Sequence, residues 1–195
     1  MSKRGKIIIL SGPSGTGKST IRDRVVARMP VPLHLSISAT TRPPRTGERD
    51  GVDYYFFSEE TFQRHRQAGD FLECKQVFGK NIWYGTLRSE VEPYLQSGKW
   101  VLLEIDVDGT ADVLQVYPDA LTIFIMPPSL EVLEQRLRSR GTESEESILC
   151  RLARAEYEIG QSSHYRYPLI NGDVEEAVVQ FCQIIQKESG ETWND

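Results

Sequence analysis

Residues 12–19 form a glycine-rich segment whose spacing is typical of a phosphate-binding loop. They read Gly-Pro-Ser-Gly-Thr-Gly-Lys-Ser and match the pattern G-x-x-x-x-G-K-[ST]. Glycines let consecutive backbone N–H groups curl around a phosphate, and the positive end of a following helix attracts the anion. Lys18 can reach the β- and γ-phosphates, and the Ser19 hydroxyl can bind Mg²⁺. The segment predicts a nucleoside triphosphate site rather than a plain strand-to-helix turn.

Two arginines separated by two prolines suggest a second anion site. Prolines hold the run Arg42-Pro43-Pro44-Arg45 in an extended backbone. In polyproline geometry three residues make one turn and advance about 9 Å, which puts Arg42 and Arg45 on the same side. Their planar forks suit a phosphate. The same residues also fit a solvated arginine loop, so the spacing leaves both readings open.

Further charged residues occur where an α/β enzyme places its ligands. Glu104 and Asp106 end a predicted parallel strand, the usual ligand edge of such a sheet. Glu104 is a candidate to contact Mg²⁺ through water, although a capping or structural role fits equally well. Arg136, Arg140 and Arg151 flank a polar stretch between two apolar helical patterns. On charge spacing alone, these arginines could line two solvated helix faces.

The elements that must position these residues alternate between strands and helices. Strands are predicted at 6–10, 35–39, 53–57, 71–77, 100–105, 121–126 and 169–170. Helices are predicted at 18–29, 58–68, 87–96 and 111–116, after Ser129, and through the apolar stripe that begins at Val174. Such alternation favours a parallel sheet covered on both faces. Residues 38–94 break the rhythm and predict a small mixed sheet inserted into the core.

The overall composition limits the classes of protein that fit. The chain has 195 residues, 39% of them hydrophobic, and a net charge of −5. This length suits one α/β domain with a sizeable core. The acidic balance argues against general binding to nucleic acid or to an anionic membrane. Three scattered cysteines lack metal-ligand spacing, and the apolar run Ile7–Leu10 is too short for a secretory leader. We therefore expect a cytoplasmic enzyme without a membrane helix.

Motifs along nearly the whole chain resemble the guanylate kinase family. They are Ser-Gly-Pro-Ser-Gly-Thr-Gly-Lys-Ser-Thr at 11–20, Thr-Arg-Pro-Pro-Arg at 41–45, Gly-Glu at 47–48, Gly-Val-Asp-Tyr-Tyr-Phe at 51–56, Tyr-Gly-Thr at 84–86, Glu-Ile-Asp at 104–106 and Arg-Gly-Thr-Glu at 140–143. The resemblance covers residues 4–188, with the motifs in family order. It implies transfer of the γ-phosphate of ATP to GMP, with Mg²⁺, in purine nucleotide metabolism.

The resemblance also implies a role for individual residues. ATP would contact Gly12, Pro13, Ser14, Gly15, Thr16, Gly17, Lys18, Ser19, Thr20 and Asn171, with Ser19 on the metal. GMP would contact Ser38, Arg42, Arg45, Tyr54, Glu73, Tyr84, Thr86 and Asp106. Lys18 and Arg42 would act in catalysis with the lid arginines Arg136, Arg140 and Arg151.

Two of these roles have alternatives in the residues themselves. Glu73 would read guanine N1–H and the exocyclic amine, yet its alternation with Leu72 and Cys74 reads as an exposed strand carboxylate. Asn171 would lie near the adenine, but its side chain could equally cap the following helix.

The fold implied by the resemblance is a three-layer α/β P-loop kinase with a central parallel sheet. Its core would comprise residues 1–37, 95–135 and 152–188, with a small mixed-β GMP-binding insertion at 38–94 and a helical lid at 136–151. Small-molecule partners would be ATP, GMP and dGMP, and the protein would be a monomer or homodimer. No nucleic-acid or membrane partner is expected.

Two rival functions share much of this pattern. A kinase of the same fold could phosphorylate ribose 1,5-bisphosphate, which offers no guanine for Glu73 to read. A non-catalytic scaffold module would typically lack the phosphate cradle that residues 12–19 supply. Three features depart from the family: a longer segment at 78–84, Asp108 where Gln or Glu is usual, and Arg166 in place of a common Asp.

Overall fold

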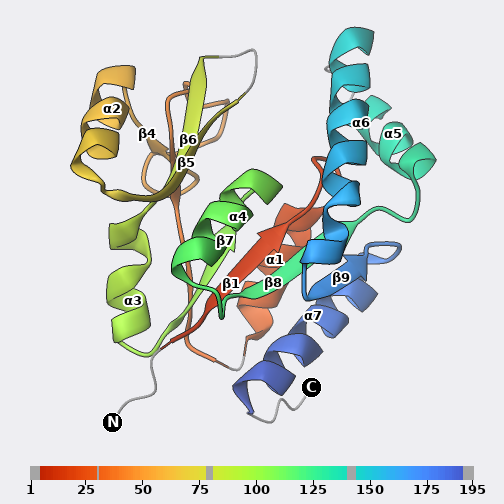
Figure 1. The fold of residues 1–195 in the computed structure, drawn as a ribbon. Helices are drawn as coiled ribbons and strands as arrows, with labels where there is room; N and C mark the ends of the chain where they lie inside the picture. Colours follow the sequence, from red (N-terminus) through yellow and green to blue (C-terminus); the bar gives the residue numbers. More distant parts are fainter. Residues whose placement is uncertain (1–4, 30, 78–80, 140–143, 191–195) are drawn as a thin grey trace. The chain divides into compact units, whose positions relative to one another are not determined.

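The computed structural model describes residues 5–29, 31–77, 81–139 and 144–190 (Figure 1). Its strands are β1 (Ile7–Ser11), β2 (Leu33–Leu35), β3 (Ser38–Thr40), β4 (Tyr55–Phe56), β5 (Phe71–Val77), β6 (Ile82–Leu87), β7 (Trp100–Glu104), β8 (Leu121–Met126) and β9 (Tyr167–Ile170). Its α-helices are α1 (Lys18–Arg28), α2 (Glu59–Ala68), α3 (Glu92–Gln96), α4 (Val107–Val116), α5 (Leu130–Arg138), α6 (Glu145–Gly160) and α7 (Val174–Ser189). Two short 3₁₀ turns are η1 (Arg88–Glu90) and η2 (Ser162–His164).

Five strands form a parallel sheet in the order β2-β7-β1-β8-β9, and four form a second sheet in the order β4-β3-β6-β5. The chain also divides into two compact units. One comprises residues 1–7, 34–103 and 108–120, and the other residues 8–33, 104–107 and 121–195. The predicted α/β class with a central parallel sheet and a small mixed sheet is confirmed.

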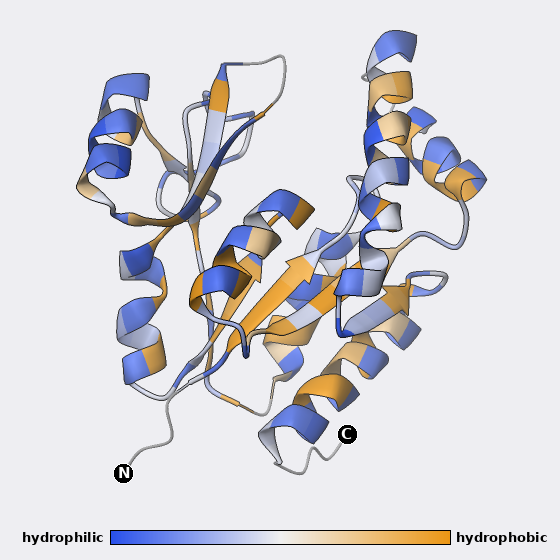
Figure 2. Cartoon of the chain, viewed as in Figure 1, coloured by the Kyte–Doolittle hydropathy of each residue, from blue (hydrophilic) through white to orange (hydrophobic). Residues whose placement is uncertain are grey.

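The unit that contains β1, β8 and β9 has a strongly apolar core. β1 pairs in parallel with β8, where Ile8 lies opposite Leu121, and β8 pairs in parallel with β9. Every residue of β1 is buried, as are the first five of β8, and both strands stand out as hydrophobic in Figure 2. Continuous apolar runs of this kind are typical of parallel strands covered on both faces. Helices α1 and α7 contact each other in this unit.

The smaller sheet of the other unit is mixed. β3 runs parallel to β4 and antiparallel to β6, which is antiparallel to β5. Its core contains Ala39, Phe62, Phe71 and Leu87. Helix α2 supplies Phe62 and has the expected Ser58 cap, whose side chain accepts a hydrogen bond from the Thr61 N–H.

Two of the predicted elements are wrong. The single strand expected at 35–39 is two strands, β2 and β3, interrupted at residues 36–37. The helix expected at 87–96 is present only as α3, because Leu87 ends β6 and a 3₁₀ turn follows it. β6 itself was not predicted, although its residues Ile-Trp-Tyr-Gly-Thr-Leu are mostly aromatic and β-branched, as strands favour.

No helix in the described part of the chain is long and apolar enough to span a membrane.

Candidate active site

The loop at residues 12–17 has positive φ at three glycines, and at two of them an added Cβ would also collide with a neighbouring segment. Gly12 has φ +139°, and a Cβ there would lie 2.2 Å from the carbonyl oxygen of Ile125 in β8. Gly17 has φ +86° and precedes α1, and a Cβ there would lie 2.6 Å from Asn171 Nδ2. Because side chains rarely adopt such backbone angles, the loop sequence follows from its geometry.

The N-terminus of α1 is suited to bind an anion. Its N-cap residue is Gly17, so no side chain caps the first N–H groups, and the first turn of α1 contains no acidic residue. The helix dipole therefore presents its positive end without a neighbouring carboxylate from the helix itself. Lys18 Nζ donates to the carbonyl oxygens of Gly12 at 2.6 Å and Pro13 at 2.9 Å, so its ammonium group lies against the loop. Thr16 is buried, and its hydroxyl also donates to the Pro13 carbonyl.

A hydroxyl and a carboxylate lie together beside this loop. Ser19 Oγ is 3.5 Å from Glu104 Oε1, and Arg22 Nη1 is 2.7 Å from Glu104 Oε2. Hydroxyl and carboxylate oxygens are ligands that Mg²⁺ accepts, and a magnesium ion bound to nucleotide phosphates needs only one or two carboxylates. The described residues contain no cluster of three or more His, Cys, Asp or Glu side chains, so the chain alone does not form a metal cage there. The donors fit an ion held jointly with a bound phosphate.

Two of the three predicted lid arginines lie near the phosphate-binding loop. Arg151 Nη1 in α6 donates to the Ser14 hydroxyl at 3.2 Å, and Arg136 Nη2 in α5 donates to the Asn171 carbonyl at 3.1 Å. Arg140 lies outside the described residues. Helices α5 and α6 pack through a cluster of Leu133, Leu137, Leu152 and Ala155, and the two α5 leucines also approach Gly15. Helices α5 and α6 are thus both in contact with the loop or with Asn171 beside it.

Asn171 follows β9 and is almost fully buried. Its Nδ2 donates to the Thr16 carbonyl at 2.7 Å, while its Oδ1 has no hydrogen-bond partner within the described residues. The alternative reading of Asn171 as a helix cap is wrong, because Asp173 caps α7 by accepting from the N–H groups of Glu175 and Glu176. A buried amide oxygen without a donor is costly, which makes Asn171 Oδ1 a candidate acceptor for a ligand.

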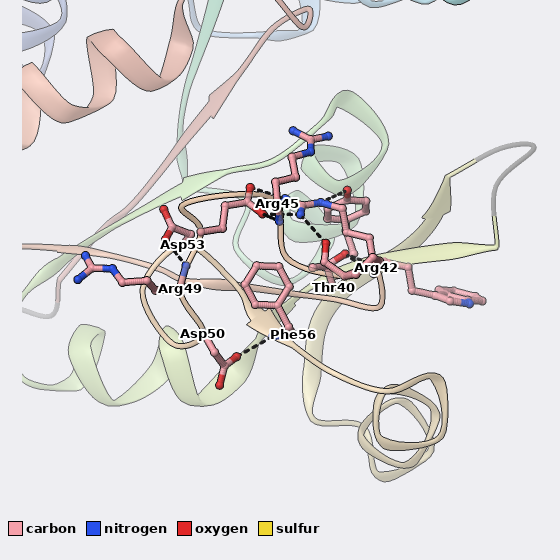
Figure 3. A network of polar contacts seen from close by, with 11 residues as sticks. Thr40, Arg42, Arg45, Arg49, Asp50, Asp53 and Phe56 are labelled. Carbon is pink, nitrogen blue, oxygen red and sulfur yellow. Dashed lines mark hydrogen bonds and ion pairs between the residues drawn. The ribbon is translucent and has the colours of Figure 1, made fainter. Parts of the chain in front are cut away.

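Arg42, two residues after β3 of the smaller sheet, is the centre of the network drawn in Figure 3. Its Nη1 and Nη2 donate to the two carboxylate oxygens of Glu48 at 2.6 and 2.8 Å. Nη1 also donates to the Pro43 carbonyl, and Nε donates to the Tyr84 hydroxyl at 3.1 Å. The side chain is 8% exposed. Four of the five N–H groups of this guanidinium therefore have acceptors, which fixes its orientation.

The Arg42 contact changes the titration of Glu48. Hydrogen bonds from Arg42, and next from the Arg45 backbone N–H, lower the pKa of Glu48 from 4.5 to about 2. The spacing argument placed Arg42 and Arg45 together on one anion. The two do share the Glu48 carboxylate, but Arg45 through its backbone N–H, and no contact drawn in Figure 3 reaches the Arg45 guanidinium.

Two tyrosines predicted to bind phosphate lie beside Arg42. Its guanidinium carbon is 4.8 Å from the centre of the Tyr54 ring, and the Tyr54 and Tyr84 rings meet edge to face at 5.9 Å. Because the Tyr84 oxygen accepts from Arg42 Nε, its own O–H can donate elsewhere. The structure thus brings Arg42, Tyr54 and Tyr84 to one place.

Glu73 is buried, so the reading of an exposed strand carboxylate is wrong. It is 8% exposed, and its Oε1 accepts a hydrogen bond from the Thr86 hydroxyl at 2.7 Å. The physical reason is a shift in register between Phe71 and Glu73, where β5 pairs with β6. Such an irregularity breaks the alternation of faces, and Phe71, Leu72 and Glu73 are all buried. Ser38 pairs with Thr86 across β3 and β6, which places it close to the same carboxylate.

Asp106 belongs to the unit that contains the phosphate-binding loop. Arg154 Nη2 in α6 lies 3.5 Å from Asp106 Oδ2, and Arg154 Nε donates to Glu158 Oε1 at 2.9 Å. Burial raises the pKa of Glu158, against the effect of Arg154.

Several residues that organise these sites were not predicted. Glu48 holds Arg42, Arg22 holds Glu104, and Arg154 lies between Asp106 and Glu158. One of them left a signal in the sequence: Arg22 follows Ser19 by three residues on α1, and residues at that spacing share a helix face.

The structure gives a reason for arginine at position 166, where the sequence alone offered none. Its guanidinium contacts both carboxylate oxygens of Glu188 in α7, at 2.8 and 3.2 Å. The Tyr167 hydroxyl donates to the same carboxylate. This position therefore ties the start of β9 to the end of α7.

Comparisons with known proteins agree with one another. A family model described as guanylate kinase matches residues 4–188. A guanylate kinase of Rhodopirellula baltica is 52% identical over 182 residues, which cover 93% of this chain and 87% of that protein. A guanylate kinase of Symbiobacterium thermophilum is 44% identical over 189 residues, covering 97% and 88%.

Solved structures extend this agreement to the fold. The crystal structure of guanylate kinase from Anaplasma phagocytophilum matches with a TM-score of 0.78 and 33% identity, covering 97% of this chain and 89% of that one. A shikimate kinase from Bacteroides thetaiotaomicron matches with a TM-score of 0.53 at 17% identity, covering 95% and 98%, which shows a likeness of fold alone.

Proposed function

Because the chain belongs to the guanylate kinase family, which transfers the γ-phosphate of ATP to GMP, we propose how its residues divide that work. Residues 12–20 bind the phosphates of ATP, and the small mixed sheet binds GMP. The acceptor phosphate oxygen attacks the γ-phosphorus directly, so the protein forms no covalent intermediate.

Guanine is selected by the buried pair of Glu73 and Thr86. A carboxylate can accept from N1–H and the exocyclic amine of guanine, whereas adenine has no donor at N1. When adenine takes the place of guanine, the buried Glu73 carboxylate lacks the hydrogen-bond donors of the base, which costs several kcal/mol of binding free energy. The burial of Glu73 therefore favours guanine over adenine. Ser38 and Asp106 complete the base site. The burial of Glu73 is the observation that carries the assignment of the acceptor.

The phosphate of GMP binds at Arg42, Arg45, Tyr54 and Tyr84. The fifth N–H of the Arg42 guanidinium, on Nη2, has no acceptor among the described residues. The hydroxyl of Tyr84 can donate alongside it. Arg45 adds a second guanidinium, whose side chain is exposed and can turn toward the anion.

The γ-phosphate is stabilised by Lys18 and the lid arginines. Lys18 leaves the loop carbonyls to bind the β- and γ-phosphates, while the backbone N–H groups of residues 12–20 and the α1 dipole hold them. Arg136, Arg140 and Arg151 neutralise charge on the transferred group. One well-placed arginine of this kind accelerates phosphoryl transfer by about 10³–10⁵. Asn171 Oδ1 accepts from the adenine amino group.

Magnesium would be held by the Ser19 hydroxyl and, through water, by Glu104. When bound, it would neutralise the charge that develops on the transferred phosphate. Arg22 keeps Glu104 oriented toward Ser19.

The remaining properties follow the family. The GMP-binding insertion comprises residues 38–94, the lid 136–151, and the core 1–37, 95–135 and 152–188. The enzyme acts in the cytoplasm as a monomer or homodimer, accepts dGMP as well as GMP, and has no nucleic-acid or membrane partner.

An acceptor panel tests this proposal. ADP release from ATP·Mg²⁺ is measured with GMP, dGMP, AMP, CMP, UMP and ribose 1,5-bisphosphate, for the native enzyme and for Glu73→Gln. We expect GMP and dGMP to be the fastest acceptors, and Glu73→Gln to lower kcat/KM for GMP by about 10²-fold. KM for ATP should change less than about twofold, since uniform losses would indicate a folding defect. Equal rates with AMP and GMP would refute the role of Glu73, and turnover of the bisphosphate alone would refute the proposed acceptor.

A further inference from the structure

Glu90, in the 3₁₀ turn after β6, makes a set of contacts that the phosphoryl-transfer chemistry does not explain. It is 9% exposed. Its Oε1 accepts from the Tyr55 hydroxyl at 2.8 Å. Its Oε2 accepts from the Ile37 backbone N–H at 3.2 Å and is 3.1 Å from His34 Nε2. One buried carboxylate therefore joins β2, the segment before β3, the start of β4 and the end of β6.

Each of these contacts lies next to a residue of the proposed GMP site. Ile37 directly precedes Ser38, Tyr55 directly follows Tyr54, and Glu90 itself lies four residues after Thr86. We propose that Glu90 is a positioning residue for GMP, which holds Ser38, Tyr54 and Thr86 in register through the segments that carry them. This inference rests on the proposed function of the small sheet.

The contact with Tyr55 matters most, because β4 is a very short strand at the edge of its sheet. Its two residues pair with Ala39 and Thr40 of β3, and the Phe56 N–H donates to Asp50 Oδ1. Side chains of neighbouring residues in an extended segment point to opposite sides. Anchoring Tyr55 on Glu90 therefore fixes the direction in which Tyr54 points, toward the Arg42 guanidinium. The Glu90 hydrogen bond also raises the pKa of Tyr55 to about 12, because ionising the phenol would remove the proton that the carboxylate accepts.

The contact with His34 restricts the position of the Glu90 carboxylate. The His34 ring stacks on Tyr94 of α3, with 3.4 Å between ring centres and 9° between planes. This packing limits the movement of the imidazole, and with it the movement of the carboxylate. A buried carboxylate needs several donors to offset its desolvation, and Glu90 has them from three separate segments.

The test compares Glu90→Gln and Tyr55→Phe with the native enzyme. Gln keeps the size of the side chain but replaces one acceptor oxygen with an N–H₂ donor, and Phe removes only the hydroxyl. Glu92→Gln is the matched control, since Glu92 lies two residues away and its carboxylate pairs with Arg88 at a half-exposed position. KM for GMP and for ATP, kcat and thermal midpoints are measured for all four proteins, together with the double variant.

We expect Glu90→Gln and Tyr55→Phe each to raise KM for GMP by about 5–20-fold, as for one lost charge-assisted hydrogen bond. KM for ATP should stay within about twofold, and the control should match the native enzyme. The double variant should lose little more than either single variant, because both break the same contact.

A purely structural Glu90 would give lower thermal midpoints with an unchanged KM for GMP, and this result would overturn the inference. So would equal rises in KM for both substrates. If Glu90→Gln fails to fold, Tyr55→Phe alone decides by the same criterion. A native enzyme that does not phosphorylate GMP would instead overturn the proposed function, whereas an active native enzyme with unaffected variants would overturn only the role of Glu90.

Discussion

The two phosphate sites proposed for this protein are built in opposite ways. The ATP side uses one short stretch of backbone, in which glycines at 12, 15 and 17 adopt positive φ and α1 supplies its N-terminus. The GMP side uses side chains from several segments, held by other side chains: Glu48 holds Arg42, Thr86 holds Glu73, and Glu90 holds Tyr55. A backbone cradle depends on the conformation of its own residues, whereas a side-chain cradle depends on its supporting contacts. The predictions below test this contrast.

The largest effect on turnover is expected from Lys18, the one charged residue in the segment 12–19. Lys18→Ala should lower kcat by at least about 10³-fold, because the charge that develops on the γ-phosphate loses the ammonium group that lies against the loop. ADP release under saturating ATP and GMP measures this. Lys187→Ala, an exposed lysine on α7, is the control. An unchanged kcat for Lys18→Ala would mean that the backbone and the arginines suffice.

Gly12→Ala should distort the phosphate-binding loop sterically, without any change of charge. The new Cβ would lie 2.2 Å from the Ile125 carbonyl oxygen, at a φ that side chains rarely adopt. We expect the free energy of unfolding to fall by about 2–4 kcal/mol, measured by urea denaturation, with a higher KM for ATP.

Gly69→Ala is the matched control for this change. Gly69 also has positive φ, but nothing lies within 4 Å of the place that an alanine Cβ would take, so this variant should lose only about 1–2 kcal/mol. Equal losses for both variants would show that backbone strain, not the contact with β8, decides the effect.

Arg42→Lys tests the side-chain cradle while retaining its charge. Lysine cannot reproduce the bidentate contact with Glu48 together with the bond to Tyr84. KM for GMP should rise about 10–100-fold, with KM for ATP within about twofold. Steady-state kinetics with each substrate varied in turn measure both, and Arg64→Lys on α2 serves as control. A parallel rise for ATP would indicate general misfolding instead.

The smallest effect concerns the pH dependence of the Arg42–Glu48 pair. The folded-state pKa of Glu48 is about 2, below its ordinary 4.5. A carboxyl with a depressed pKa adds stability above its unfolded pKa and loses it as pH falls. The native protein should therefore be more stable than Glu48→Gln above about pH 4.5, with the difference shrinking from there toward about pH 2.

Urea denaturation at pH 7, 5, 4 and 3.5 follows this difference. A gap between the two proteins that stays constant across this range would contradict the assigned pKa.

The same contrast explains which parts of the molecule the sequence predicts. The ATP loop is contiguous, so its spacing alone identified it, and the bounds predicted for β5 and β8 are confirmed because each is one apolar or alternating run. The strands of the small sheet could not be predicted in this way. β6 follows a segment without a clear signal, β4 has two residues, and a local shift in register buries Glu73 against the alternation of its strand.

Supporting residues are harder still to predict. Glu48, Glu90 and Arg154 act through contacts that exist only after distant segments meet. The family resemblance supplied the residues proposed to face the substrates. Among the residues that hold them, Arg22 alone has a signal in the local pattern of the chain, because it follows Ser19 by three residues on α1.

The parallel pairing of β1 with β8 has a consequence for synthesis of the protein. Gly12 closes against Ile125, and Ile8 lies opposite Leu121, so the loop that is translated first meets its neighbouring strand more than a hundred residues later. Ribosomes add about 5–20 residues per second, so the nascent chain waits several seconds before this part of the nucleotide site can close. During that interval the apolar strand β1 has no β8 to cover its edge, and an uncovered apolar edge of this kind is prone to aggregate unless a chaperone binds it.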